Sequence, residues 1–136
     1  MKKTKGGVIK RAIITPDKHF PLHDQKAINV VCKAIKIVKP DIYIDLGDTG
    51  EWDLFSNHHW RKYDKPPDDL LIPMLDKSVK QVNKGMDQID KFLNKVNCNE
   101  RYFMQGNHEE WLDTYAKKYS RPRFLTQNAL RLKQRG

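Results

Sequence analysis

The stretch Ile42-Tyr43-Ile44-Asp45-Leu46-Gly47-Asp48-Thr49-Gly50-Glu51 decides the expected fold. Its first five residues form the short apolar run of a buried β-strand, and Gly47 permits the tight turn that ends this run. Residues 8–14 form a similar run that stops at Thr15-Pro16 and leads into Asp17-Lys18-His19. Residues 101–104 likewise lead into Gly106-Asn107-His108-Glu109. The sequence therefore predicts three strands, each running directly into side chains that commonly ligate metals.

Helical periodicity separates these three strands. Apolar residues recur at helical spacing over residues 27–38, where Asp24 can cap the helix and Pro40 stops the pattern. A second apolar stripe over residues 71–96 repeats every three or four residues and predicts one long amphipathic helix despite Gly85. Residues 50–69 are expected to form a short helix and an irregular loop, and residues 111–119 a helix after the third strand.

Strands that alternate with helices pair in parallel through right-handed crossovers. We therefore expect an α/β fold with a mostly parallel sheet and flanking helices, in a single domain of residues 1–136. Parallel connection places all three strand ends at one edge of the sheet, which is the edge where ligands bind in open α/β sheets. Segments far apart in the chain can thus form one site.

The composition excludes a disordered chain and a membrane-spanning one. Of the 136 residues, 38% are hydrophobic and 32% are charged, and no apolar run approaches the roughly 20 residues that a membrane helix needs. The lysine-rich start leads into Gly6-Gly7 rather than into the apolar core of a signal peptide, so we expect a cytoplasmic protein. Cys32 and Cys98 sit among apolar neighbours without CxxC spacing, which favours buried, reduced thiols.

The net charge of +9 is concentrated at the two ends of the chain. Residues 1–11 carry five basic and no acidic side chains, and residues 117–136 carry seven basic and none acidic. Such ends could attract a phosphate-rich partner such as nucleic acid, or they could simply keep mobile termini solvated. Both interpretations stay open at this point.

The residue types at the three strand ends suit a divalent metal site. Asp17 and His19 are two apart just past a strand, where extended backbone directs both side chains to the same side. Asp48 can bridge two metals through its two oxygens, and Asn107 offers a neutral carbonyl oxygen. This mixed ligand set suits manganese, iron, zinc or cobalt better than a structural zinc ion, which would favour thiolates. Asp48 and Glu109 have a structural alternative, as a turn residue and as a carboxylate at a helix N-terminus.

The three motifs resemble those of the calcineurin-like metallophosphoesterases, whose pattern runs DxH, GDxx(D/E), GNH(D/E), then a later histidine and a GHxH segment. Each motif alone is weakly specific, but three in order, each after a predicted strand, are strongly so. The resemblance covers residues 8–118, and residues 17–24 (DKHFPLHD) are similar to the small phage and bacterial members. It implies the first half of the family's four-layer α/β/β/α sandwich, and the cytoplasm of a bacterium or of a phage-infected host cell.

The resemblance also implies a metal site. Asp17 and His19 would bind a first cation, Asp48 would bridge two, and Asn107 would bind the second. Mn²⁺ is the expected cation, with Fe, Zn, Co or Mg as alternatives. Two cations together would activate a water for in-line attack on a phosphate monoester or diester.

His108 and Asp48 are the catalytic residues that the resemblance implies. His108 would protonate the departing oxygen, with Glu109 as the residue that orients its imidazole. Glu51 is expected to accept a hydrogen bond from a ligand histidine. His23 is expected to support its loop or to contact substrate. His58 and His59 lie among aromatic residues and are expected to pack there or to contact substrate.

The family's later histidine and GHxH segment are absent from this sequence. Most ligands of the second metal are therefore missing, so weak or single-metal binding is expected. One face of the sheet is expected to lack its cover, and the alternation over residues 129–136 predicts the start of a further strand. The chain is thus expected to be the incomplete N-terminal part of a truncated or split phosphoesterase, with a second chain as a candidate partner.

Two other functions stay open. The chain could be a non-catalytic remnant that binds a metal or a partner without turnover. It could also be a basic nucleic-acid-binding module, whose affinity would fall steeply with salt.

Overall fold

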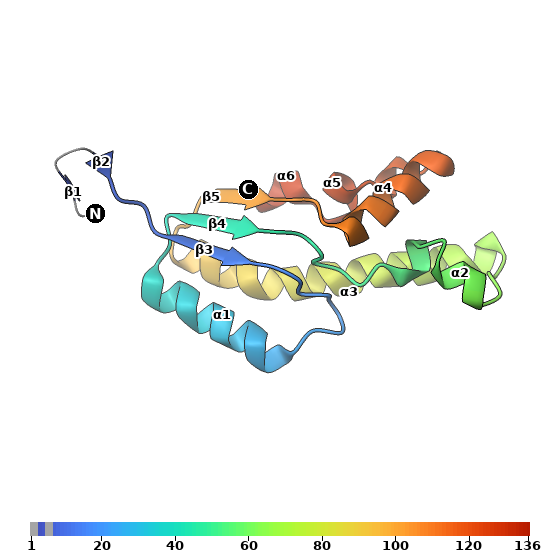
Figure 1. Ribbon diagram of the computed structural model, residues 1–136, viewed down its shortest axis with the longest axis horizontal. Coiled ribbons are helices and arrows are strands. Elements are labelled where there is room, and N and C mark those ends of the chain that lie inside the picture. Colours follow the sequence, from blue (N-terminus) through green and yellow to red (C-terminus); the bar gives the residue numbers. More distant parts are fainter. Residues whose placement is uncertain (1–2, 5–6) are drawn as a thin grey trace.

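The computed structural model describes residues 3–4 and 7–136 (Figure 1). Its centre is a three-stranded parallel sheet in the order β3 (Ala12–Thr15), β4 (Ile42–Asp45) and β5 (Glu100–Phe103). In the register of this sheet Thr15 lies beside Asp45, which lies beside Phe103. The predicted α/β fold with a parallel sheet and flanking helices is confirmed, and the three strand ends meet at one edge.

Helical segments connect the strands. Helix α1 (Gln25–Val38) links β3 to β4, while η1 (Asp53–Phe55), α2 (His59–Lys62) and the long α3 (Asp68–Lys95) link β4 to β5. After β5 the chain forms α4 (Asn107–Lys118), η2 (Pro122–Phe124), α5 (Thr126–Ala129) and α6 (Leu132–Arg135). Near the N-terminus, β1 (Lys3–Thr4) and β2 (Gly7–Val8) form a separate antiparallel pair. None of the described helices combines the length and apolarity needed to cross a membrane.

The helix boundaries follow the predicted signals. The Asp24 side chain accepts a hydrogen bond from the backbone N–H of Lys26 at 2.8 Å, which caps the first turn of α1. Gly85, inside α3, is needed for packing, because a Cβ there would lie 2.3 Å from the ring of the fully buried Phe20. This close contact fixes the loop that follows β3 against the long helix.

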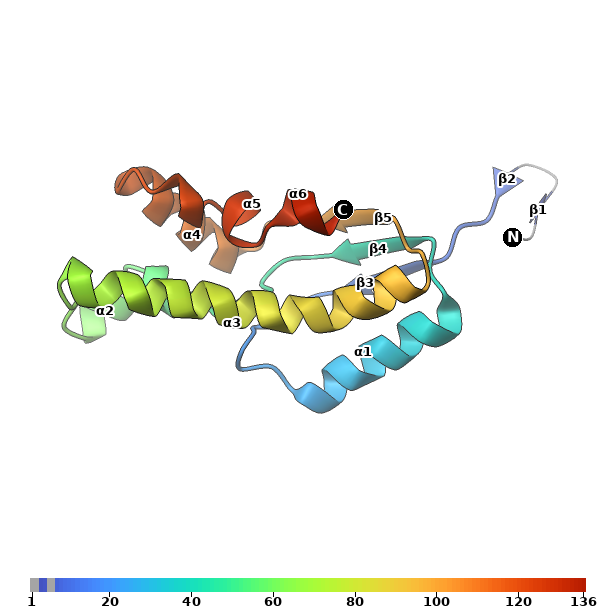
Figure 2. The same cartoon turned by 180° about the vertical axis from the view of Figure 1, so that it is seen from behind.

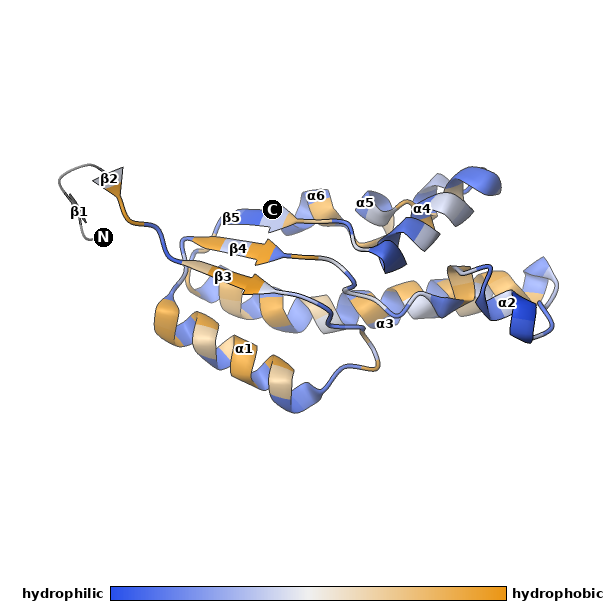
Figure 3. Cartoon of the chain, in the orientation of Figure 1, coloured by the Kyte–Doolittle hydropathy of each residue, from blue (hydrophilic) through white to orange (hydrophobic). Residues whose placement is uncertain are grey.

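Helices α1 and α3 pack against one face of the sheet, as the opposite views in Figures 1 and 2 show. In both helices hydrophobic and hydrophilic residues alternate along the ribbon (Figure 3), as in amphipathic helices that pack on a sheet. The core combines side chains of the helices with Tyr43 of β4 and the aromatic residues Phe20, Trp52, Phe55 and Phe124. Cys32 and Cys98 are free and buried, as predicted, and burial raises the pKa of both thiols.

The opposite face of the sheet is open. Ile14 of β3 and Tyr102 of β5 are each 53% exposed, and Leu46 and Met104, just past β4 and β5, are also exposed. Figure 1 views the sheet from this side, with α3 behind it. The expectation of an uncovered sheet face therefore agrees with the described structure.

Two secondary-structure predictions need correction. The predicted strand over residues 8–14 is divided, because β2 ends at Val8 and β3 begins at Ala12. The predicted strand over residues 129–136 is wrong, since this segment ends α5 and forms α6. The reason is tertiary: the Arg135 guanidinium is 10% exposed and donates to the backbone oxygen of Leu130 at 2.7 Å and to Asn83 Oδ1 at 2.6 Å.

Local ion pairs engage much of the positive charge of residues 117–136. Arg121 pairs with Asp68 at 2.7 Å, Arg123 with Asp76, and Arg131 and Arg135 with Asp87. These aspartates all belong to α3. The C-terminal segment is thus a folded layer that pairs with α3, and the idea of a mobile, solvated C-terminus is wrong.

Candidate metal centre

The first two strand ends are joined by backbone hydrogen bonds. The N–H groups of Asp17, His19 and Phe20 donate to the carbonyl oxygens of Gly47, Asp48 and Thr49 at 3.2, 3.0 and 2.8 Å. Phe20 in turn accepts from Glu51 at 2.8 Å. The two loops therefore continue the parallel pairing of β3 and β4 and bring both motifs to one place.

The loop after β5 is held against the loop after β4 by a close contact between two glycines. Gly47 has a φ of +90°, and a Cβ there would lie 2.3 Å from the backbone nitrogen of Gly106. A Cβ on Gly106 would lie 2.2 Å from Asp48 Oδ1. That oxygen accepts from the backbone N–H of His108 at 2.9 Å, so Asp48 is attached to the start of α4. Both glycines are required because no larger residue leaves room for this approach.

Three of the predicted ligands have left-handed backbone conformations, so the expectation of extended backbone at Asp17 and His19 is wrong. The φ angles of Asp17, His19 and Asp48 are +43°, +49° and +47°. Such a conformation costs a non-glycine residue of order 1–3 kcal/mol and clusters at functional sites, although it also occurs here next to helix ends, at Lys39, Asn97, Ser120 and Arg131. Here the surrounding hydrogen bonds hold all three residues in it.

Asp17, His19 and Asp48 form a compact group of potential ligands. One ligand atom from each lies within 4.8 Å of the others, with Asp17 exposed and His19 and Asp48 partly buried. Asn107 is exposed at the first position of α4, next to His108. Two carboxylates and one imidazole are a donor set that suits Mn²⁺, Fe²⁺, Zn²⁺ or Co²⁺, so these residues fit the cation that the resemblance implies.

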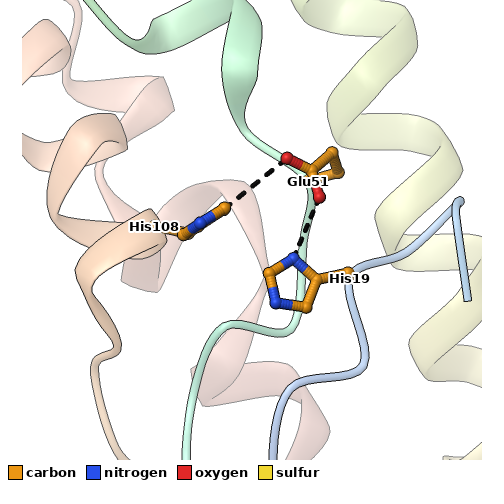
Figure 4. A group of neighbouring side chains, drawn as sticks. All are labelled: His19, Glu51 and His108. Carbon is orange, nitrogen blue, oxygen red and sulfur yellow. Dashed lines mark hydrogen bonds and ion pairs between the residues drawn. The ribbon is translucent and has the colours of Figure 1, made fainter. Parts of the chain in front are cut away.

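Glu51 lies between two imidazoles (Figure 4). Its Oε2 is 2.9 Å from His19 Nδ1 and its Oε1 is 3.8 Å from His108 Nδ1. The His108 ring packs edge to face on His19, with centroids 4.7 Å apart, and lies 4.2 Å from the ring of Trp111. This agrees with the predicted role of Glu51 as an acceptor that orients a ligand histidine.

Glu109 does not have the role that was predicted for it. Its side chain is fully buried, and its two oxygens accept from five N–H groups. These belong to the backbones of Asp48, Thr49, Gly50 and Gly106 and to the Trp52 indole, at 2.7–3.4 Å. Adjacent residues on a helix point in different directions, so Glu109 turns into the protein while His108 turns toward Glu51. Glu109 therefore holds the Asp48 loop, and the structural alternative describes it better.

A buried polar layer lies beneath the site, and the sequence did not reveal it. Lys18 Nζ is 2.7 Å from Asp45 Oδ1, and both side chains are nearly fully buried. Asp45 Oδ1 also accepts from the Gly47 N–H at 3.0 Å and the Thr49 hydroxyl at 2.8 Å. Burial, with the nearby charge of Asp45, strongly raises the pKa of Tyr43 in this layer. Strand alternation gave no signal here, because Asp17 and His19 on either side of Lys18 have left-handed rather than extended backbone.

The three remaining histidines lie outside these two ligand groups. His23 packs on Phe20, with ring centroids 4.7 Å apart, and its Nε2 lies 2.9 Å from Gln25 Oε1. His59 packs against Trp60 and Tyr63, and His58 is exposed at the start of α2. The positions of His23 and His59 agree with loop support and packing, whereas His58 is exposed. Contact of these histidines with a substrate stays a prediction.

Comparisons with known proteins identify no relative, because no protein-family model, no curated protein and no solved structure matches this chain.

Proposed function

We propose that this chain is a metal-dependent phosphoesterase module that hydrolyses phosphate monoesters or diesters, built as the first half of a four-layer α/β/β/α sandwich. The observation that carries the proposal is the convergence of Asp17, His19 and Asp48 from two strand ends to within 4.8 Å. Their shared left-handed backbone supports it, because such conformations in non-glycine residues cluster at functional sites.

The proposed ligands have distinct tasks. Asp17 and His19 hold the first cation together with Asp48, and Asn107 supplies a neutral oxygen toward a second. A divalent cation bound there, with Mn²⁺ as the leading candidate, would offset phosphate charge and lower the pKa of a water toward neutrality. Asp48 Oδ1 is held by the His108 N–H, which leaves Oδ2 of the same carboxylate for a cation.

His108 is the proposed general acid. An imidazole can take up and release a proton near neutral pH, and the Glu51 carboxylate lies 3.8 Å from the Nδ1 of His108. Packing on Trp111 and His19 limits how far the ring can turn. Nε2 is then the nitrogen available to donate a proton to the departing alkoxide.

The test is hydrolysis of bis(p-nitrophenyl) phosphate with added Mn²⁺. Asp48→Asn and His108→Ala should each lower the rate at least about 100-fold, as expected for the loss of a cation ligand or of a general acid. Asp64→Asn and Glu110→Gln, both at exposed positions, serve as matched controls that should retain the rate. A wild-type chain without activity, or activity that survives in both site variants, would refute the proposal.

A second candidate function is a non-catalytic module that binds another protein chain. The open sheet face favours it, because Ile14, Tyr102 and Met104 are more than half exposed on one surface. Ile14→Thr with Met104→Gln should then weaken association measured by sedimentation, in a chain that does not hydrolyse the test diester. The nucleic-acid-binding alternative is less favoured, since four arginines of the C-terminal segment already pair with aspartates of α3.

A further inference from the structure

We infer that His19, Glu51 and His108 form a second cation site, distinct from the one that contains Asp17 and Asp48, which binds a metal of the Zn²⁺ or Co²⁺ type. The three residues come from three different strand ends and meet at one point (Figure 4). One ligand atom from each lies within 4.8 Å of the other two. This inference does not depend on phosphoester hydrolysis, because the site can form whether or not the chain is an enzyme.

The distances suit coordination after a small contraction. Metal–ligand bonds of 2.0–2.2 Å at angles between octahedral and tetrahedral place neighbouring ligand atoms about 2.8–3.6 Å apart. His19 Nδ1 and Glu51 Oε2 are 2.9 Å apart, and His108 Nδ1 and Glu51 Oε1 are 3.8 Å apart. A shift of a few tenths of an ångström in the His108 ring would bring its Nδ1 into range of Glu51. The ligand atoms of the two imidazoles, which lie within 4.8 Å of each other, would also move closer on binding.

One atom of this group lacks a hydrogen bond that its burial demands. His108 Nδ1 is buried, and within the described part of the chain it has no hydrogen-bond partner. A buried polar atom without a partner destabilises the folded state. Coordination of a cation would use this nitrogen, and the packing of its ring on Trp111 already holds it toward Glu51.

The ligand types separate this site from its neighbour. Two imidazoles and one carboxylate favour Zn²⁺, Co²⁺ or Ni²⁺, whereas carboxylate-rich ligation suits Mn²⁺ better. His19 is common to both groups, but its imidazole has a second nitrogen on the side away from Glu51 (Figure 4). The inferred site therefore needs His108 and Glu51, and it does not need Asp17 or Asp48.

Zinc binding to the full chain, measured by competition with a chromophoric chelator, tests this inference. His108→Gln and Glu51→Gln should each weaken Zn²⁺ binding at least about 10-fold. Asp48→Asn should change Zn²⁺ affinity less than about 3-fold, although it weakens Mn²⁺ binding. Glu110→Gln, on the exposed side of the same helix as His108, is the matched control.

A second measurement uses the wild-type chain, so it does not depend on the folding of a variant. Addition of Zn²⁺ should shift the ¹⁵N resonance of His108 Nδ1. Three results would overturn the inference: no Zn²⁺ binding by the wild type, an unshifted His108 Nδ1, or equal weakening by Asp48→Asn and His108→Gln. The last result would mean that one cation is shared by all the ligands.

Discussion

Glu51 and Glu109 are two carboxylates of the same small site, but their surroundings differ in every respect. Glu109 is fully buried, and its oxygens accept from five N–H groups that belong to loops and to the start of α4. Glu51 is about 20% exposed and faces the rings of His19 and His108. The Glu109 oxygens are fully occupied by hydrogen bonds within the protein, whereas the Glu51 oxygens face only the two imidazoles and could also contact a cation.

This difference separates the part of the site that supports structure from the part that can perform chemistry. N–H groups cannot be displaced from Glu109 without breaking the turns that position Asp48. At the inferred site, the imidazoles of His19 and His108 next to Glu51 would bind a cation through their side-chain nitrogens. The two residues therefore provide a matched pair for mutagenesis. The same change from glutamate to glutamine should strongly lower the free energy of unfolding at Glu109 and hardly change it at Glu51.

Glu109→Gln should give the largest loss of stability. The amide NH₂ would face N–H donors, and the remaining oxygen would replace charge-assisted hydrogen bonds with weaker ones, so we expect a loss of about 3–5 kcal/mol. Urea unfolding followed by circular dichroism measures this loss. Glu110→Gln, at the adjacent exposed position, should change stability by less than about 0.5 kcal/mol. An unchanged midpoint for Glu109→Gln would mean that the network around Glu109 contributes little.

Lys18→Met should give the next largest loss and extends the comparison to the layer beneath the site. The change leaves the carboxylate of Asp45 buried without its cation, at a cost of about 3 kcal/mol. Lys33→Met, on the exposed side of α1, is the control in the same urea experiment. Asp45→Asn added to Lys18→Met should restore part of the loss, and a double variant less stable than the single one would contradict this account.

The strands and helices could be predicted because short-range patterns determine them. The apolar run at residues 42–46 and the stripe over residues 71–96 each needed one face to be buried, and β4 and α3 bury those faces. The segment over residues 129–136 was mispredicted because its structure depends on Arg135 contacting Asn83 and Leu130, far from any local pattern.

The candidate site could be predicted only in part, for a related reason. Parallel topology alone brings the three strand ends together, so Asp17, His19 and Asp48 were accessible from the sequence. The order of the motifs did not predict that Glu109 would accept hydrogen bonds from backbone N–H groups. Those donors lie in a loop about 60 positions earlier in the sequence. Helical geometry did indicate that His108 and Glu109 would not contact each other, because adjacent residues on a helix point in different directions.

Glu51→Gln should give the smallest change in stability and completes the comparison. The change keeps the size of the side chain and can keep the 2.9 Å contact to His19, because an amide oxygen still accepts a hydrogen bond. We expect the free energy of unfolding to change by less than about 1 kcal/mol without metal, in the same urea experiment that detects the loss in Glu109→Gln. With excess Zn²⁺, wild type should gain more stability than Glu51→Gln, because a ligand at free concentration c stabilises the folded state by RT ln(1 + c/Kd), which is smaller when binding is weaker. A large loss of stability in Glu51→Gln without metal would contradict this account. It would mean that the negative charge of Glu51 stabilises the fold even when no cation is bound, as that of Glu109 does.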